Sequence, residues 1–441
     1  MKLDITDVQW QGVRFLDRNF RTFFYDGSYY KALLPTAEAW MEPAFLEGFF
    51  NTLHDRGFIP RMEKADIRMD GFLEIYKQET DFFSIYLSSF PPDMLKDAAL
   101  LYLDLCSWLH DNNVSLIDGH AGNFIIQKNA QIRWCDVGSF SVFDQAVTVD
   151  SLRQFFYNIL GPLFIREKFP HSGDLVRHFA YHNDLKAAAA AEMFGIRIDF
   201  YDSMDLKESL SQLREMIQAL QFQFTPTTWS NYYTPVENED VLDYESNRVK
   251  IFDNIIKDLR PKHIIDIGAN TGFFSRRAAV NGAEVLSLDA DEAAVNKHYV
   301  YIKQNGYSGN VKPALASFSS LPPGRGKVGD LAIALALTHH LFLSQHYNWA
   351  VIAEYLAAHT TKNLLTEFMP NGLSMTEEPK WLPHNYSLDN FQRQLLRFFE
   401  KVRPITYDNQ SNSPRIFLLC LKKREHPLDA DKPSFYFGLT D

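Results

Sequence analysis

The sequence has few cysteines, no long apolar run and no excess of basic residues, and each absence excludes a class of protein. Only three of its 441 residues are cysteines, at the widely spaced positions Cys106, Cys135 and Cys420. This spacing indicates neither a disulfide framework nor a zinc site. No run reaches the roughly 18 apolar residues of a membrane span, and the charged N-terminal residues are not those of a signal peptide.

The charge balance excludes a further class. A formal net charge of −11 disfavours a general nucleic-acid-binding protein, because phosphate contacts need clustered lysine and arginine. With 46% hydrophobic and 22% charged residues, the composition is that of a soluble globular protein. We therefore expect a cytoplasmic protein with neither a membrane nor nucleic acid as partner. Its length predicts two or three domains.

The last third of the chain alternates apolar runs with helical patterns, which predicts a doubly wound α/β domain. The expected strands are 264–267, 285–288, 330–337, 363–366, 402–407 and 415–421, and the expected helices are 347–359 and 388–399. The last two strands, separated by the turn-rich residues 408–414, are expected to form an antiparallel pair at the edge of the sheet.

The first half has a different pattern, typical of an α+β domain. A strand is expected at 71–77, a helix that opens on prolines at 93–110, and mostly helix, including an alanine run at 186–191, over 150–222. The Pro-containing stretch 225–240, with Trp229, Tyr232 and Tyr233, is the predicted boundary. The predicted domains are therefore 1–224 and 225–441.

Residues 263–291 are the most informative stretch for function. Asp266 lies in an apolar run that leads into the turn Gly268-Ala-Asn270-Thr-Gly272, and a second apolar run ends at Asp289. This pattern is typical of a β-turn-α-β unit in which glycines allow close backbone approach to a ligand and the second carboxylate binds a ribose. It indicates a cofactor that contains adenosine.

Two details favour S-adenosylmethionine over a dinucleotide. Asn270 replaces the middle glycine of the dinucleotide motif, and Asp266 precedes the turn. Negative charge at that point suits the cationic sulfonium and amino group better than a pyrophosphate. Asp266 is expected to bind the amino-acid portion, directly or through water, and Asp289 both ribose hydroxyls. The alternative is a β-turn-α unit with incidental glycines.

Through IDIGANTGFFS and VLSLDAD, residues 230–422 resemble the class I S-adenosylmethionine-dependent methyltransferases. The resemblance implies a seven-stranded Rossmann-like sheet with the cofactor across the carboxyl ends of its strands. It also implies cofactor contacts at Ala290 and an adenine near Ala316 and Ser317. An acidic residue that many members carry near the adenine is absent here.

Thr338-His339-His340 and Glu367 follow the fourth and fifth predicted strands, where a reacting centre would lie. Methyl transfer needs positioning and, for a hydroxyl or amine acceptor, removal of a proton. A histidine with a pKa near neutrality is suited to that role, oriented by Glu367. Alternatively, one histidine faces the core and the other caps a helix. A metal bound by the adjacent pair is not expected. The absence of an Asn/Asp-Pro-Pro-Tyr motif weakens the interpretation of the protein as a nucleic-acid N-methyltransferase.

A second constellation comprises Asp118, His120, Asn123 and Asp136. It resembles the catalytic and metal loops of the aminoglycoside phosphotransferase-like kinases, which implies proton acceptance at Asp118 and Mg²⁺-ATP held by Asn123 and Asp136. No glycine-rich phosphate loop precedes residue 70, and Lys31 and Glu47 are only candidates for the lysine–glutamate pair. A kinase-like fold retained for binding or scaffolding is therefore favoured over phosphotransfer. A plain hairpin with polar loops is the third alternative.

The whole chain resembles a group of bacterial two-part proteins, some described as nodulation-type, with a kinase-like front and a methyltransferase back. The interpretation is a methyltransferase acting on an unidentified small-molecule or saccharide acceptor. A small-molecule kinase with an accessory methyltransferase domain and a non-catalytic cofactor-binding scaffold are the alternatives. The acceptor and the oligomeric state do not follow from the residues.

Overall fold

The computed structural model describes residues 1–11, 18–85, 87–173, 195, 205–225, 227, 246–307, 309–318, 328–373, 382–407 and 415–428. Contacts divide the chain into unit 1, residues 1–127 and 131–225, and unit 2, residues 128–130 and 226–441. Trp229, Tyr232, Tyr233 and the alanine run 186–191 lie outside the described residues. Among the residues described, no helix is both long and apolar enough to cross a membrane.

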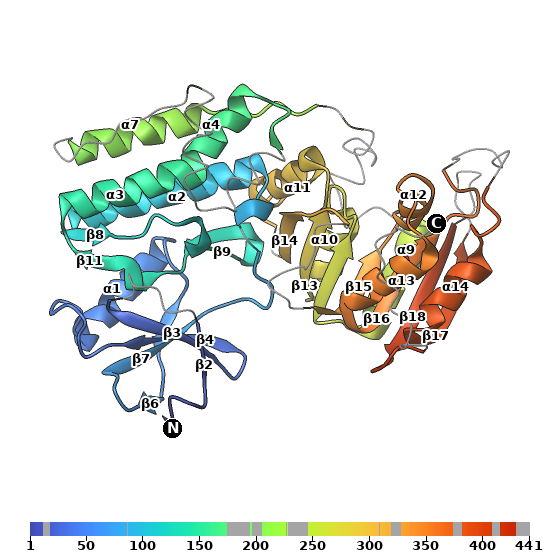
Figure 1. The fold of residues 1–441 in the computed structure, drawn as a ribbon, viewed down its shortest axis with the longest axis horizontal. Helices are drawn as coiled ribbons and strands as arrows, with labels where there is room; N and C mark the ends of the chain where they lie inside the picture. Colours follow the sequence, from blue (N-terminus) through green and yellow to red (C-terminus); the bar gives the residue numbers. More distant parts are fainter. Residues whose placement is uncertain are drawn as a thin grey trace, which may run out of the picture. The chain divides into compact units, whose positions relative to one another are not determined.

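Unit 2 is built on a mixed seven-stranded sheet in the order β14-β13-β12-β15-β16-β18-β17 (Figure 1). The strands are β12 (His263–Ile267), β13 (Glu284–Asp289), β14 (Asn310–Leu315), β15 (Gly329–Ala334), β16 (Thr360–Phe368), β17 (Phe399–Tyr407) and β18 (Arg415–Lys423). β12 to β16 pair in parallel, whereas β18 is antiparallel to both β16 and β17. This sheet confirms the predicted α/β Rossmann-like fold and the antiparallel pair at its edge.

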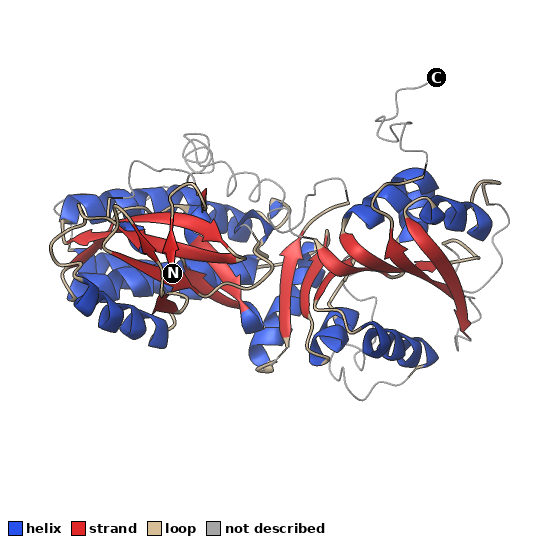
Figure 2. Ribbon diagram, turned by 90° about the horizontal axis from the view of Figure 1, so that it is seen from below, coloured by secondary structure: helices blue, strands red, loops and turns tan. Residues whose placement is uncertain are grey.

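Helices cover both faces of this sheet (Figure 2). They are α9 (Asn247–Leu259), α10 (Phe273–Val280), α11 (Glu292–Gln304), α12 (Thr338–Leu343), α13 (Trp349–Ala358) and α14 (Leu388–Leu396). Side chains cap several of their first turns: Ser246, Asp291 and Asn348 each accept a hydrogen bond from a backbone N–H three residues on. Because the central strands are apolar on both faces, they need this two-sided cover.

Two elements of unit 2 differ from the predicted bounds. The strand expected to reach residue 337 ends at Ala334, because Ala336 adopts a left-handed conformation (φ 52°) that the strand cannot continue through. The helix expected to reach 399 ends at Leu396, and β17 begins three residues later. Residues 408–414 lie outside the described part of the chain.

Unit 1 contains a five-stranded antiparallel sheet in the order β2-β3-β4-β7-β5. Its strands are β2 (Gln9–Trp10), β3 (Phe20–Tyr25), β4 (Ser28–Leu33), β5 (Met62–Lys64) and β7 (Glu74–Gln78), and a parallel pair joins β1 (Lys2–Leu3) to β6 (Arg68–Met69). The strand predicted at 71–77 begins only at Glu74, since Gly71 lies in a turn with φ 92°.

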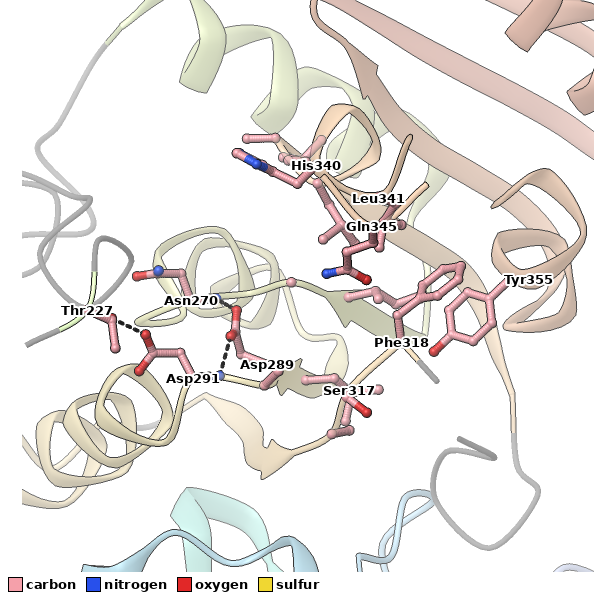
Figure 3. A pocket seen from close by; sticks show the side chains of 18 of the residues that line it. Thr227, Asn270, Asp289, Asp291, Ser317, Phe318, His340, Leu341, Gln345 and Tyr355 are labelled. Carbon is pink, nitrogen blue, oxygen red and sulfur yellow. Dashed lines mark hydrogen bonds between the residues drawn. The ribbon is translucent and has the colours of Figure 1, made fainter. Parts of the chain in front are cut away.

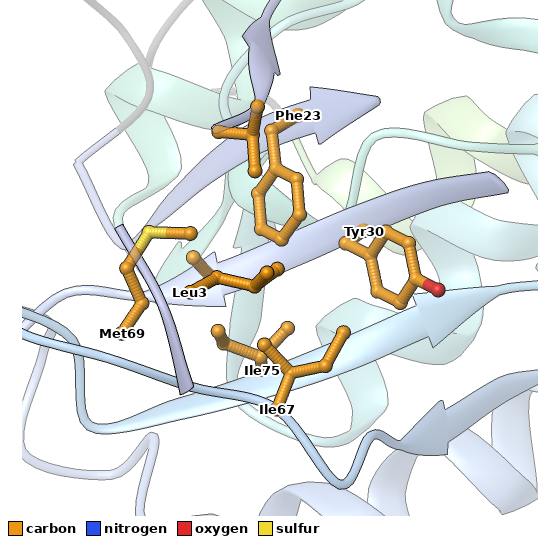
Figure 4. Close-up of a cluster of buried hydrophobic side chains, with 8 residues drawn as sticks. Leu3, Phe23, Tyr30, Ile67, Met69 and Ile75 are labelled. Atoms are coloured by element: carbon orange, nitrogen blue, oxygen red, sulfur yellow. The ribbon is translucent and has the colours of Figure 1, made fainter. Parts of the chain in front are cut away.

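Both faces of this sheet are buried. One face forms an apolar cluster with β1 and β6 that includes Leu3, Phe23, Tyr30, Met69 and Ile75 (Figure 4). The other face packs against α1 (Pro43–Asp55), where the ring centroids of Phe50 and Tyr76 are 5.3 Å apart. Lys31 lies opposite Tyr76 in the register, so its side chain projects toward this second, interior face.

Helices and short hairpins make up the rest of unit 1. The helices are α2 (Pro92–Asp111), α3 (Gln145–Phe155), α4 (Gly161–Lys168), which a π-helical segment (Phe156–Leu160) joins to α3, and α7 (Leu206–Ala219), with short 3₁₀ turns at Leu87–Ser89, Ala121–Asn123 and Val137–Ser139. A further 3₁₀ turn, Lys128–Ala130, belongs to unit 2. The two antiparallel hairpins pair β8 (Val114–Leu116) with β11 (Phe140–Val142), and β9 (Phe124–Gln127) with β10 (Gln131–Trp134). The helix predicted at 93–110 is present as α2.

We expect Gly119→Ala to destabilise unit 1 by about 1–3 kcal/mol, because a Cβ there would lie 2.2 Å from the Ser151 carbonyl oxygen of α3. Gly48→Ala is the matched control, since a Cβ at this position in α1 meets open space and favours the helix by about 0.5–1 kcal/mol. Chemical unfolding followed by circular dichroism measures both. Equal stability of Gly119→Ala and the parent protein would show that the Asp118 loop does not pack on α3.

Candidate functional site

The turn after β12 depends on three left-handed residues: Gly268 (φ 75°), Asn270 (φ 54°) and Gly272 (φ 78°). A Cβ at Gly268 would lie 3.2 Å from the Leu337 side chain, and one at Gly272 would lie 1.9 Å from the His298 ring. Asparagine tolerates this conformation better than most residues, which accounts for Asn270 between two glycines. The turn therefore requires glycine for close packing as well as for its backbone conformation.

Asp289 ends β13 beside this turn. One oxygen, Oδ2, accepts a 2.7 Å hydrogen bond from the Asn270 N–H, and Oδ1 accepts a 2.8 Å bond from the Asp291 N–H (Figure 3). Two backbone donors thus fix the carboxylate while its remaining lone pairs can still accept bonds from a ligand. Burial raises the pKa of Asp289 to about 6, against the two backbone hydrogen bonds, which lower it.

Asp266 lies behind the turn. Its side chain is 3% exposed, and its Oδ2 accepts a 2.6 Å hydrogen bond from the Ser275 hydroxyl of α10. Burial raises the pKa of Asp266 to about 7, the Ser275 bond lowers it, and the charge of Asp289 raises it. Since Asp266 is not among the residues that line the neighbouring cavity, the structure places it where it can shape the turn.

A cavity of about 440 Å³ opens at the carboxyl ends of β12, β13 and β15, within the size range of small-molecule sites. Its lining residues are Thr227, Ile267, Gly268, Asn270, Leu288, Asp289, Ala290, Asp291, Glu292, Ala316, Ser317, Phe318, Leu335, Ala336, Leu337, His340, Leu341, Gln345 and Tyr355. Of the predicted cofactor residues, the structure brings five together here. Gly272 and Asp266 contribute from behind the wall.

Aromatic side chains lie at one end of the cavity, which the sequence pattern did not indicate. Phe318 follows Ser317 directly, and its ring centroid lies 3.8 Å from that of Tyr355 in α13 (Figure 3). The Phe318 centroid also lies 4.8 Å from that of Tyr347. The hydroxyl of Tyr355 is buried without a hydrogen-bond partner in the described part of the chain. The predicted adenine segment ended at Ser317, directly before Phe318.

The two histidines occupy different environments. His340 lines the cavity, whereas His339 is 4% exposed and its ring packs against that of His340, with centroids 3.9 Å apart. Burial lowers the pKa of His339 to about 3, helped by the neighbouring His340, and burial lowers that of His340 to about 4. Both imidazoles are therefore neutral at pH 7, and neither has the near-neutral pKa expected from the sequence.

Glu367, expected to orient a histidine, is fully buried at the end of β16. Its Oε2 lies 2.9 Å from Nη2 of Arg248 and 3.5 Å from Nη1 of Arg415. The same oxygen accepts a 2.8 Å hydrogen bond from the Ala336 N–H. This carboxylate is thus bound to two arginines and to the backbone of the cavity wall.

In unit 1, hydrogen bonds and an ion pair connect the second set of predicted residues. Lys31 lies 3.8 Å from Oδ1 of Asp136, and the Asn123 amide donates a 3.4 Å bond to the Asp118 carbonyl. The Cys135 N–H bonds the Asn123 carbonyl at 2.8 Å, which brings the two hairpin ends together.

The acidic partner of Lys31 is therefore Asp136, and its Nζ also donates a 2.9 Å hydrogen bond to the Thr22 hydroxyl. Glu47, the other predicted candidate, is exposed on α1. His120 has a local role: its Nδ1 accepts a 2.8 Å bond from the Gly122 N–H. Among the described residues, no three His, Cys, Asp or Glu side chains are grouped as metal ligands would be.

No family model matches the chain. Among curated proteins, nodulation protein NoeA of Rhizobium meliloti (strain 1021) is 24% identical over 331 residues, 63% of this chain. The chain spans 66% of that relative's length. Among known structures, magnesium protoporphyrin IX methyltransferase from Synechocystis PCC 6803, with bound SAH, is 19% identical with a TM-score of 0.31, covering 41% of this chain and 90% of that one. TehB from Haemophilus influenzae is 16% identical with a TM-score of 0.33, and the match covers 42% of this chain and 67% of TehB.

We expect affinity for S-adenosylhomocysteine to fall as the pH is lowered through about 6, because protonation of Asp289 removes acceptors for the ribose hydroxyls. Titration calorimetry between pH 8 and 5 measures this. Asp289→Asn is the control, and its residual binding should lack the step near pH 6.

The stability of the ligand-free protein should change with pH in the opposite direction. The folded state holds protons on Asp266 and Asp289 above the ordinary pKa of 3.8, so these groups add stability as the pH falls from about 7.

Proposed function

We propose that unit 2 is an S-adenosylmethionine-dependent methyltransferase. The observation that carries this proposal is the charge of the cavity. Asp289, Asp291 and Glu292 line it, and no lysine or arginine is among its described lining residues. A pyrophosphate in this place would face carboxylates without a cation, whereas a sulfonium and an ammonium group are attracted to them.

The residues present fit this cofactor from one end to the other. Asp289 offers the remaining lone pairs of its carboxylate to a ribose diol. Phe318 and Tyr355 offer an apolar surface to an adenine, and the unpartnered Tyr355 hydroxyl offers one polar contact. The left-handed turn from Gly268 to Gly272 leaves room for the amino-acid end. When bound, S-adenosylmethionine supplies an electrophilic methyl group for in-line displacement.

His340 is the residue we propose for proton removal, since it lines the cavity and is neutral at pH 7. Its lowered pKa makes it a modest base, suited to an acceptor that loses its proton as the methyl group is transferred. We propose a small molecule or saccharide as the acceptor. The acidic rim disfavours nucleic acid, because phosphates would be repelled there.

We expect Asp289→Ala and Asp266→Ala to abolish measurable binding of S-adenosylhomocysteine in calorimetry. The first removes the ribose acceptor, and the second removes the anchor of Ser275 beneath the turn. Asp258→Ala, which changes an exposed aspartate of α9, is the matched control and should bind normally. Undiminished affinity in both active-site variants would exclude the cofactor assignment.

Transfer itself is tested with methyl-labelled S-adenosylmethionine and fractionated small-molecule and saccharide extracts. A labelled product whose formation is lost in His340→Ala supports the enzyme. Cofactor binding with no labelled product in any fraction, macromolecules included, would favour the non-catalytic scaffold instead.

We propose, as a second function, that unit 1 binds a nucleoside triphosphate with Mg²⁺. The specific observation in favour is the buried contact between Lys31 and Asp136, which joins the interior face of the five-stranded sheet to the hairpins that carry Asp118 and Asn123. A lysine next to a carboxylate can neutralise a phosphate while the carboxylate holds the metal ion. Asp118 would accept a proton only if phosphotransfer also occurs.

We expect Lys31→Met to weaken binding of Mg²⁺-ATP by about tenfold or more, because a phosphate would lose its cationic partner. Lys77→Met is the control, since Lys77 is exposed on the neighbouring strand β7. Calorimetry with Mg²⁺-ATP measures both variants. Equal affinities, or no binding to the parent protein, would exclude this second function.

A further inference from the structure

The buried carboxylate of Glu367 does more than neutralise charge, because it contacts the backbone next to the cavity. Its Oε2 accepts the 2.8 Å hydrogen bond from the Ala336 N–H, and its own main-chain carbonyl accepts a 2.6 Å bond from the Thr338 hydroxyl. Glu367 therefore contacts both residues that flank Leu337.

Ala336 needs such support. Its φ of 52° is left-handed, a conformation that is unfavourable for a residue with a Cβ. Leu337 follows directly, lines the cavity, and packs within 3.2 Å of the place where a Cβ at Gly268 would lie. The conformation of Ala336 thus determines how Leu337, which follows β15, packs against the turn from Gly268 to Gly272.

The two arginines make this arrangement possible. A fully buried, unpaired carboxylate is strongly disfavoured, but Arg248 of α9 and Arg415 of β18 lie 2.9 and 3.5 Å from Oε2. Arg248 is itself held over the Phe274 ring of α10, 4.7 Å from its centroid. Two elements that do not line the cavity, α9 and β18, therefore converge on the one carboxylate that bonds its wall.

We propose that Glu367 is a positioning residue, which holds Ala336 in its left-handed conformation and so sets the Leu337 wall against the Gly268 turn. This proposal rests on the proposed cofactor function of unit 2. It gives Glu367 a role in addition to the orientation of a histidine expected from the sequence. The chemistry of the site would then depend on Glu367 through the shape of the cofactor cavity.

The test is a double-mutant cycle with S-adenosylhomocysteine in calorimetry. We expect Glu367→Gln to weaken binding by about tenfold, because the wall loses its charged acceptor. In the Ala336→Gly background the same substitution should cost only about twofold to threefold, since glycine adopts the left-handed conformation unaided. Equal losses in both backgrounds would overturn the proposal.

Two further variants guard against trivial loss of folding. Glu367→Asp keeps the charge for both arginines but is too short to reach the Ala336 N–H, and it should weaken binding as Glu367→Gln does. Glu284→Gln is the matched control, because Glu284 accepts a 2.5 Å bond from the buried Lys312 at the amino end of β13, away from the cavity. It should leave affinity unchanged, and unchanged affinity in Glu367→Asp would overturn the proposal.

A readout without ligand separates this proposal from the cofactor assignment. Hydrogen exchange followed by mass spectrometry should show faster exchange of the peptide that spans 335–338 in Glu367→Gln and Glu367→Asp, but not in Glu284→Gln. If the parent protein gives no heat with S-adenosylhomocysteine, the proposed function fails while the exchange result still decides the role of Glu367. Unchanged exchange in all three variants overturns the positioning role.

Discussion

The left-handed backbone between Gly268 and Gly272 is the constraint on which the rest of the unit 2 site depends. Because the chain turns so tightly there, the N–H groups of Gly268 and Ala269 both reach the Leu288 carbonyl, at 2.8 and 2.9 Å. The Asn270 N–H then reaches Asp289. The turn thus joins the ends of β12 and β13 and leaves the carboxylate of Asp289 fixed at the cavity. A single Cβ at either glycine would push apart surfaces that are in contact.

Charge is distributed unevenly around the cavity. No lysine or arginine is among the described residues that line it, whereas the buried Glu367 behind the wall lies beside two arginines. A buried acid needs a counter-charge to stay ionised, but an acid at a ligand site can take that counter-charge from the ligand. This contrast distinguishes the buried Glu367, which supports the fold, from the carboxylates that line the cavity.

The sequence was sufficient for the sheet and the glycine turn, because apolar runs and glycine spacing are local signals. The roles of Asp266 and Glu367 were not predictable in the same way. The partners of Glu367 lie 119 and 48 residues away in the sequence, and only the folded sheet shows that its carboxylate contacts two arginines. Similarly, Tyr355 belongs to a helix whose apolar pattern gives no sign that one ring borders a cavity, and Lys31 meets Asp136 only through the fold of unit 1.

The order of the strands has a consequence for biosynthesis. β18 lies between β16 and β17, so β17 has no neighbour in the sheet until the residues after it have left the ribosome. Arg415 is the first residue of β18, and until it arrives Glu367 lacks one of its two arginines. Unit 2 therefore completes its sheet only in a late step of synthesis. A nascent chain stalled before residue 415 would expose an unpaired strand edge, a segment that chaperones recognise and that aggregation favours.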